Sequence, residues 1–175
     1  MPDGPLSDEL VFEGAIFSVH RERWPGADHA YEVVRHVGAA AVLPVTPDGD
    51  VILVRQLRPA IRGVLLEIPA GLLDLPEEDA LACATRELLE ETGYAHVRVG
   101  SLAGFYTTAG FSDELVHLFW ALTEPEPRDE PEAGIEIVRR PFAEMAAAAR
   151  AGEVPDAKTA LALLLAEARG IVPNR

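Results

Sequence analysis

The sequence is poor in cysteine and in positive charge. Its single cysteine, Cys83, cannot form an internal disulfide, which excludes a disulfide-stabilised miniprotein and fits a reducing compartment. The 15 Lys and Arg residues are outnumbered by 29 Asp and Glu residues, which gives a formal net charge of −14. Because that field repels nucleic acid and anionic membranes, we expect neither as a partner. A phosphate-bearing substrate would need divalent cations or a local basic patch.

Targeting signals and long apolar runs are also missing. The N-terminus lacks the basic start and apolar stretch of a signal peptide, and the apolar run 160–166 is too short to span a bilayer. No glycine-rich phosphate loop followed by lysine is present, which argues against a P-loop enzyme. With 49% hydrophobic and 25% charged residues, the composition excludes a disordered or collagen-like chain. We expect a soluble, cytoplasmic, single-domain protein.

The pattern along the chain predicts an α+β fold. Short β-like runs fill residues 11–66, and a helix is expected over 77–92, where apolar residues recur at helical spacing before Gly93. Further strands are predicted over 97–105, 115–122 and 135–139, and two closing helices over 142–151 and 157–169. Strands and helices mix without strict alternation, which favours an α/β/α sandwich around a mixed β-sheet. We expect a flexible tail over 1–10 and one domain over 11–175.

The predicted helix carries three glutamates within one turn. Glu87, Glu90 and Glu91 stand at i, i+3 and i+4, so their carboxylates converge on one face and repel one another. A hard divalent cation with oxygen ligands would turn that repulsion into attraction, and Mg²⁺ is the usual choice beside phosphate. Taken alone, the cluster favours a solvated acidic face, because clusters of surface glutamates are common.

The surroundings of these glutamates decide between the two interpretations. Gly71, six residues, Glu78, seven residues and then Arg-Glu-Leu-Leu-Glu-Glu-Thr-Gly-Tyr over 86–94 resemble the Nudix box. The family pattern has five residues between its first glycine and glutamate, so this chain carries one extra residue in the loop before the helix. Insertions there are structurally cheap. The resemblance implies the Nudix-type fold, with an N-terminal β segment over 11–36 and the Nudix core over 37–175.

The resemblance also implies the roles of the box residues. Glu87 and Glu91 would be the main metal ligands, with Glu90 as an inner-sphere or outer-sphere helper and the Ala70 carbonyl completing the coordination. Arg86 and Glu78 would pair to orient the helix and the loop. Two or three Mg²⁺ ions are expected, with Mn²⁺ or Zn²⁺ as alternatives.

Segments outside the box resemble the ADP-ribose pyrophosphatase branch of that family. They include Arg-Gln-Leu-Arg over 55–58, Leu-Glu-Ile-Pro-Ala-Gly over 66–71 and Ala-Gly-Phe-Ser-Asp-Glu over 109–114. This implies Mg²⁺-dependent hydrolysis of ADP-ribose to AMP and ribose 5-phosphate. Ala109 departs from the branch, whose members usually carry proline there. Another nucleoside diphosphate derivative, such as a nucleotide sugar, is therefore the alternative substrate, and a non-catalytic ADP-ribose sensor is a third hypothesis.

Several residues are candidates for holding such a substrate. Arg55 and Arg58 lie at i, i+3 near a strand end, where a twist or bulge would let one of them clamp phosphate. Trp24 and Phe17 are candidates for stacking on adenine, or else belong to the core. Glu67 is unusual in an apolar strand, and it could bind sugar, base or a backbone group. The loop carrying Gly110, Ser112 and Glu114 is a candidate for holding ribose hydroxyls.

The proton acceptor is predicted in the acidic, proline-rich loop 123–134. That loop reads as exposed and mobile. The resemblance implies that a carboxylate from it accepts the proton of the attacking water. Glu130 and Glu132 are the candidates, and we favour Glu132 because it lies nearer the last strand. The branch is typically dimeric through its N-terminal strands, so a homodimer is expected.

Overall fold

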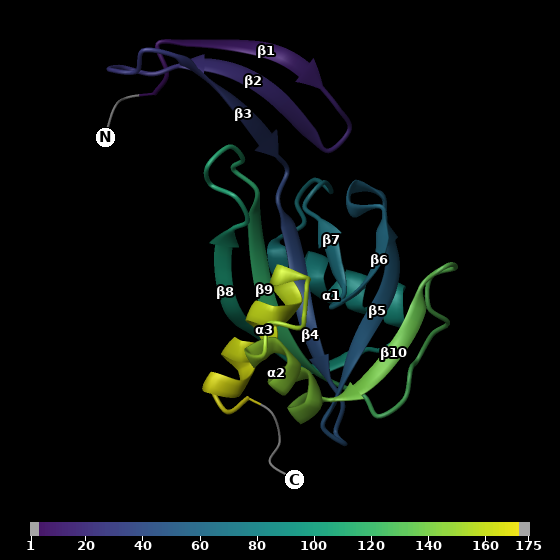
Figure 1. The fold of residues 1–175 in the computed structure, drawn as a ribbon. Helices are drawn as coiled ribbons and strands as arrows, with labels where there is room; N and C mark the ends of the chain where they lie inside the picture. Colours follow the sequence, from purple (N-terminus) through teal and green to yellow (C-terminus); the bar gives the residue numbers. More distant parts are fainter. Residues whose placement is uncertain (1–3, 172–175) are drawn as a thin grey trace.

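The computed structural model describes residues 4–171, which fold into two β-sheets and the helices around the larger one (Figure 1). The first sheet is antiparallel, in the order β1 (Ser7–Glu13), β2 (Phe17–Arg23) and β3 (Ala30–His36). It stands at one end of the molecule, away from the helices. A short link after His36 leads into the second sheet.

The second sheet is seven-stranded and mixed. Its strands are β4 (Ala39–Val45), β5 (Asp50–Arg58), β6 (Gly63–Glu67), β7 (Ala70–Leu72), β8 (His96–Tyr106), β9 (Leu115–Thr123) and β10 (Glu136–Pro141). They run in the order β10-β5-β4-β9-β8, with β6 paired to β5 and β7 paired to β4. The β4–β9 pair is parallel, whereas the others are antiparallel. The predicted α+β fold with a mixed sheet is confirmed.

Helices cover both faces of this sheet. The helix α1 (Ala80–Thr92) packs on one face, and α2 (Phe142–Arg150) and α3 (Ala157–Ala168) pack on the other. A short 3₁₀ turn, Pro59–Ile61, links β5 to β6. Along β4, Ala41 and Leu43 face α2 and α3 while Ala40 and Val42 face α1. A strand buried on both faces reads as a continuous apolar run, which is why its sequence lacks alternation.

Helix α1 begins three residues later than the sequence predicts. Asp79 is its N-cap, and its side chain accepts a hydrogen bond from the Ala82 amide at 2.8 Å. Glu77, the first residue of the predicted helix, has φ 66°, which a right-handed helix does not allow. The helix ends as predicted at Gly93, with φ 75° and its amide bonded to the Leu89 carbonyl.

One N-terminal expectation is corrected. The flexible tail predicted over 1–10 does not extend to residues 7–10, which belong to β1, and residues 1–3 lie outside the described part. This strand is exposed along its whole length, so it has no apolar alternation to signal it. Cross-strand pairs hold it instead, such as Asp8 with His20 at 2.7 Å.

Two further observations complete the fold. Cys83 is buried in α1, and its thiol donates to the Leu72 carbonyl at 3.4 Å. Burial raises the pKa of this thiol to about 11. Within residues 4–171, none of the helices combines the length and the apolar character needed to cross a bilayer.

Candidate active site

Arg86 organises the acidic face of α1. Its Nε and Nη2 donate to the two carboxylate oxygens of Glu78 at 2.8 and 2.9 Å, which confirms the predicted pairing. Its Nη1 donates to Glu87 at 2.6 Å and to Glu90 at 2.8 Å. Arg86 therefore ties the loop before the helix to two of the three clustered glutamates.

Glu91 is the buried member of the cluster, with only 6% of its surface exposed. Its carboxylate accepts from Gln56 Nε2 at 2.7 Å and from the Ala70 amide at 3.1 Å. Burial raises the pKa of Glu91 to about 7, and these hydrogen bonds offset only part of that rise. The Ala70 amide thus fixes the Glu91 carboxylate against β7.

Glu87 lies against the backbone of Gly71. A Cβ atom at residue 71 would lie 2.0 Å from Glu87 Oε1, so only glycine leaves room for this carboxylate. Burial raises the pKa of Glu87, and the charges of Glu90 and Glu132 act in the same direction although Arg86 opposes them. Several carboxylates therefore crowd one site beside β7.

The acidic loop is fastened to the end of α1. The Gly93 carbonyl accepts from the Arg128 amide at 2.7 Å and the Asp129 amide at 3.2 Å, and the Glu90 carbonyl accepts from the Glu132 amide at 2.9 Å. These bonds satisfy carbonyls that a helix C-terminus leaves without partners. The side chains of Glu130 and Glu132 remain exposed. The loop is exposed as predicted, and the structure adds its attachment to the helix.

The three glutamates of α1 do not point toward a common metal position in this structure. Among residues 4–171, no group of three or more His, Cys, Asp or Glu side chains is arranged around a common point that could hold a metal ion. Glu87 and Glu90 are turned to Arg86, and Glu91 is turned to Gln56. Their oxygens would have to rotate away from these partners to share a cation.

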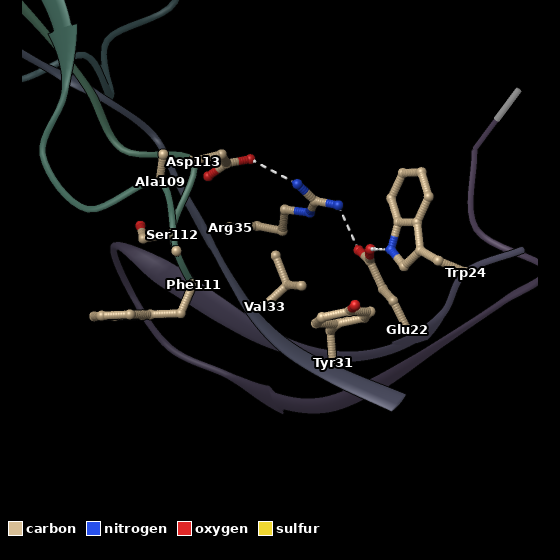
Figure 2. A pocket seen from close by; sticks show the side chains of 10 residues that line it. Glu22, Trp24, Tyr31, Val33, Arg35, Ala109, Phe111, Ser112 and Asp113 are labelled. Carbon is tan, nitrogen blue, oxygen red and sulfur yellow. Dashed lines mark hydrogen bonds and ion pairs between the residues drawn. The ribbon is translucent and has the colours of Figure 1, made fainter. Parts of the chain in front are cut away.

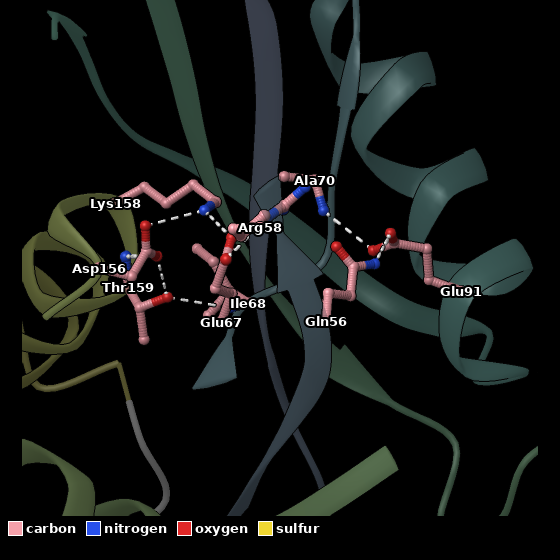
Figure 3. A network of polar contacts seen from close by, with 9 residues as sticks. All are labelled: Gln56, Arg58, Glu67, Ile68, Ala70, Glu91, Asp156, Lys158 and Thr159. Atoms are coloured by element: carbon pink, nitrogen blue, oxygen red, sulfur yellow. Dashed lines mark hydrogen bonds and ion pairs between the residues drawn. The ribbon is translucent and has the colours of Figure 1, made fainter. Parts of the chain in front are cut away.

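A second polar network joins β5 and β6 to the start of α3 (Figure 3). Sequence reasoning identified only part of it. Arg58 donates two hydrogen bonds to the buried carboxylate of Glu67, at 2.7 and 2.8 Å. Lys158 of α3 also contacts Glu67, and it contacts Asp156 at 2.8 Å. Burial pushes the pKa of Glu67 upward, but the bonds from Arg58 and Lys158 outweigh it and hold that pKa below its usual value.

The second network borders a large cavity of 860 Å³, and β7 forms another part of the cavity wall. Ala70 and Gly71 of β7 contribute to its wall, as do Arg58, Lys158 and Glu114. Its volume is in the range of small-molecule sites. The glutamates of α1 lie directly behind the Ala70–Gly71 edge, because Glu91 and Glu87 contact those two residues.

Arg55 and Arg58 do not converge. Arg55 pairs with Glu136 of β10 at 3.2 Å, whereas Arg58 pairs with Glu67 of β6, and these two strands flank opposite edges of β5. Only Arg58 lines the large cavity. The two arginines therefore do not point into one cavity, and a phosphate clamp formed by one of them stays a prediction.

A separate cavity of 470 Å³ lies between the N-terminal sheet and the loop after β8 (Figure 2). Trp24 and Tyr31 form part of its wall, opposite Gly110 and Ser112. Trp24 Nε1 donates to the buried Glu22 at 2.8 Å. Phe17 does not line this cavity and instead packs against Phe12, with ring centroids 5.9 Å apart. Gly110 and Ser112 thus face one cavity and Glu114 the other.

An arginine joins the two sides of this smaller cavity. Arg35 contacts Glu22 and also donates to Asp113 at 3.2 Å (Figure 2). Glu22, Arg35 and Lys158 were not among the sequence candidates. A glutamate in a strand or a lysine at a helix start is normally a surface residue, so nothing in the pattern distinguished them.

Comparisons with known proteins agree with this geometry. The NUDIX domain family matches residues 34–164. The chain is 38% identical over 166 residues to an ADP-ribose pyrophosphatase of Bacillus subtilis, covering 90% of this chain and 89% of the relative. It is 36% identical over 157 residues to an ADP-ribose pyrophosphatase of Mycobacterium tuberculosis (85% and 75% covered). It is also 36% identical over 160 residues to a GDP-mannose pyrophosphatase of Cronobacter sakazakii (81% and 83% covered). The chain therefore belongs to the Nudix family.

Proposed function

We propose that this Nudix enzyme hydrolyses the diphosphate bond of ADP-ribose, releasing AMP and ribose 5-phosphate. The observation that carries the proposal is the position of Glu87 and Glu91 directly behind the Ala70–Gly71 wall of the 860 Å³ cavity. A diphosphate in that cavity would be separated from the carboxylate cluster by the Ala70–Gly71 backbone. The two ADP-ribose pyrophosphatases among the relatives support the choice of substrate.

The residues present fit a magnesium centre. Glu87 and Glu91 would be the main ligands and Glu90 a helper, because all three supply the oxygen donors that Mg²⁺ prefers. Burial raises the pKa of Glu87 and of Glu91, and neighbouring carboxylates add to both rises. Bound divalent cations would neutralise the diphosphate, polarise a phosphoryl oxygen and activate the attacking water. The proposal takes two or three Mg²⁺ ions, with Mn²⁺ or Zn²⁺ as substitutes.

Other residues would bind substrate and move the proton. The carboxylate of Glu132 accepts the proton of the attacking water, which is supported by the influence of its charge on Glu87. Glu130 is the alternative acceptor. Arg58, in the cavity wall, contacts a diphosphate oxygen. Arg86 holds Glu87 and Glu90 in place until cations bind.

The smaller cavity suits the adenosine half of the substrate. Its aromatic wall at Trp24 offers a stacking surface, and Gly110 and Ser112 supply polar backbone and hydroxyl groups opposite. Glu114 lies in the large cavity instead and is placed to accept a hydrogen bond from the second ribose. Arg55 remains a phosphate candidate only if it exchanges Glu136 for substrate.

A nucleotide sugar is the second candidate substrate. Ala109, in place of the usual proline, lines the smaller cavity beside Gly110. A non-proline residue there leaves the loop backbone less restricted, which would allow a different base to fit. The GDP-mannose pyrophosphatase among the relatives supports this alternative.

We further infer a homodimer in which a second copy covers the β1–β3 sheet. Leu10, Val11 and Phe12 of β1 are 53%, 49% and 52% exposed. Exposed apolar side chains gathered on one sheet mark an interaction surface. Light scattering should give twice the monomer mass, and Val11→Glu should shift the population toward monomer. A cytoplasmic setting is consistent with the free thiol of Cys83.

A substrate panel tests the function. With Mg²⁺ present, kcat/KM should be higher for ADP-ribose than for GDP-mannose and ATP, and the products should be AMP and ribose 5-phosphate. Glu87→Gln and Glu91→Gln should remove most turnover while the melting curve remains cooperative. Near-normal turnover in both variants would refute the metal assignment, and a preference for GDP-mannose would move the substrate to the second candidate.

A further inference from the structure

Glu67 is a buried carboxylate held by two cations at once. Only 1% of its surface is exposed, and it accepts hydrogen bonds from both Arg58 and Lys158 (Figure 3). Asp156 also contacts Lys158, so two cations face two carboxylates in this network. A lysine ammonium nevertheless gives up part of its hydration to lie there.

The two cations differ in how firmly they are held. The Lys158 side chain is 17% exposed and is also bound by Asp156, at 2.8 Å. Asp156 is in turn fixed as the N-cap of α3, where it accepts from the Thr159 amide at 3.0 Å. The Arg58 side chain is 40% exposed, and Glu67 is its hydrogen-bonded partner on the wall of the 860 Å³ cavity. Arg58 is thus the cation that can turn toward a ligand.

Turning Arg58 away has an electrostatic consequence. Without a second cation, Glu67 would become an unpaired buried carboxylate, which is strongly unfavourable. The cost would oppose every contact that Arg58 makes with a substrate. Lys158 lowers that cost because it already contacts Glu67 Oε2, one of the two oxygens that Arg58 would vacate.

We propose that Lys158 is a positioning residue that keeps Glu67 paired while Arg58 turns to the substrate diphosphate. The inference rests on the proposed function for the nature of the ligand. Lys158 need not touch the substrate, since it acts through Glu67 on Arg58. The attachment of α3 to the sheet does not depend on it alone, because the Ile68 amide donates to the buried Thr159 hydroxyl at 2.9 Å.

The test compares Lys158→Met, Lys158→Arg, Glu67→Gln and the double variant Lys158→Met with Glu67→Gln. In Lys158→Met, Glu67 should retain Arg58, so KM for ADP-ribose should rise at least tenfold while kcat changes less than threefold. Lys158→Arg keeps the charge and should restore most of the KM. Glutamine carries no charge, so in the Glu67→Gln background the loss of Lys158 leaves no unpaired buried carboxylate. Adding Lys158→Met there should change KM less than threefold.

Other roles of Lys158 give different results. A residue that only supports the fold should lower the melting temperature of Lys158→Met and leave KM unchanged, which would overturn the proposal. If Lys158 binds phosphate directly, Lys158→Met should raise KM equally with and without Glu67→Gln. This outcome would also overturn the proposal. The double variant therefore separates an indirect role from a direct one.

A binding measurement separates this proposal from the choice of substrate. Calorimetric titration with inorganic pyrophosphate and Mg²⁺ should show at least tenfold weaker binding to Lys158→Met, reversed by Glu67→Gln. If ADP-ribose is not hydrolysed but this pattern holds, the proposal stands for a diphosphate ligand and the substrate assignment falls. If ADP-ribose is hydrolysed and pyrophosphate affinity is unchanged by Lys158→Met, the positioning role is wrong.

Discussion

The amide of Glu132 donates to the carbonyl of Glu90 at 2.9 Å. This bond joins the acidic loop to the last turn of α1, so the loop carboxylate and the helix carboxylates share one neighbourhood. The charge of Glu132 contributes to the raised pKa of Glu87. The side chains of the loop are exposed, but this backbone hydrogen bond keeps the loop next to the glutamates of α1.

This relationship gives the first prediction. Glu132→Gln removes the proton acceptor but keeps the amide that bonds Glu90, so kcat should fall by about 10²–10⁴-fold with little change in KM. Glu130→Gln is the matched control in the same loop and should cost less than about tenfold. Steady-state kinetics with ADP-ribose measure both. The reverse ranking would transfer the role to Glu130, and a small effect of both variants would exclude the loop.

The contact between Gly71 and Glu87 gives the second. Gly71→Ala would place a methyl group 2.0 Å from Glu87 Oε1, so the carboxylate must move and turnover should fall by about 10²-fold. The control is Gly104→Ala, where the added Cβ meets its nearest neighbour at 3.8 Å and activity should remain within about threefold. Equal activity of the two variants would show that the position of Glu87 is unimportant.

The third prediction concerns pH. With a pKa of about 7, folded Glu91 binds more protons than the unfolded chain between about pH 4.5 and 7, so stability should fall as pH rises through this window. Glu67 has a lowered pKa, and its contribution is lost only below that window. Without divalent cations, Tm of the parent protein should drop between pH 5 and 8 by about 2–4 °C per kcal/mol lost.

Two comparisons isolate the Glu91 contribution. Glu91→Gln should flatten the dependence of Tm on pH, because glutamine does not titrate. Saturating Mg²⁺ should raise the Tm of the parent protein more at pH 8 than at pH 5, since cation ligands must be deprotonated. An equal Mg²⁺ effect at both pH values would contradict the assignment of Glu91 as a ligand.

The fourth prediction addresses the smaller cavity. Trp24→Ala removes the stacking surface and should raise KM for ADP-ribose about tenfold, with a smaller effect on the affinity for inorganic pyrophosphate, which has no base. Trp24→Phe keeps an aromatic ring and should recover part of the loss. If both ligands weaken equally, Trp24 supports the fold through Glu22 and does not bind adenine.

The sequence predicted the helices, the strands of the larger sheet other than β7, and the Arg86–Glu78 pair, because apolar periodicity and the fixed spacing of a motif are local properties. It missed β1 because a strand exposed on both faces has no apolar alternation. It also missed the Lys158–Glu67 contact, which joins residues 91 positions apart and depends on how α3 docks.

Some candidate substrate residues that are close in the sequence also lie apart in the structure. The loop over 109–114 was predicted as one unit, yet Ser112 faces the smaller cavity and Glu114 the larger. Arg55 and Arg58 were predicted as a pair, but Arg55 contacts β10 and Arg58 contacts β6. These two strands pair with opposite edges of β5. Spacing along the chain does not fix which neighbour a side chain meets.

The burial of Cys83 has a practical consequence for watching the acidic loop move. The chain carries one cysteine, and its thiol is buried with a pKa near 11, so it should react slowly with maleimide reagents. A cysteine introduced at the exposed Glu126 would then be the preferred point of attachment for a fluorophore or a spin label. Its mobility could be followed as Mg²⁺ and substrate are added, without first removing the native thiol.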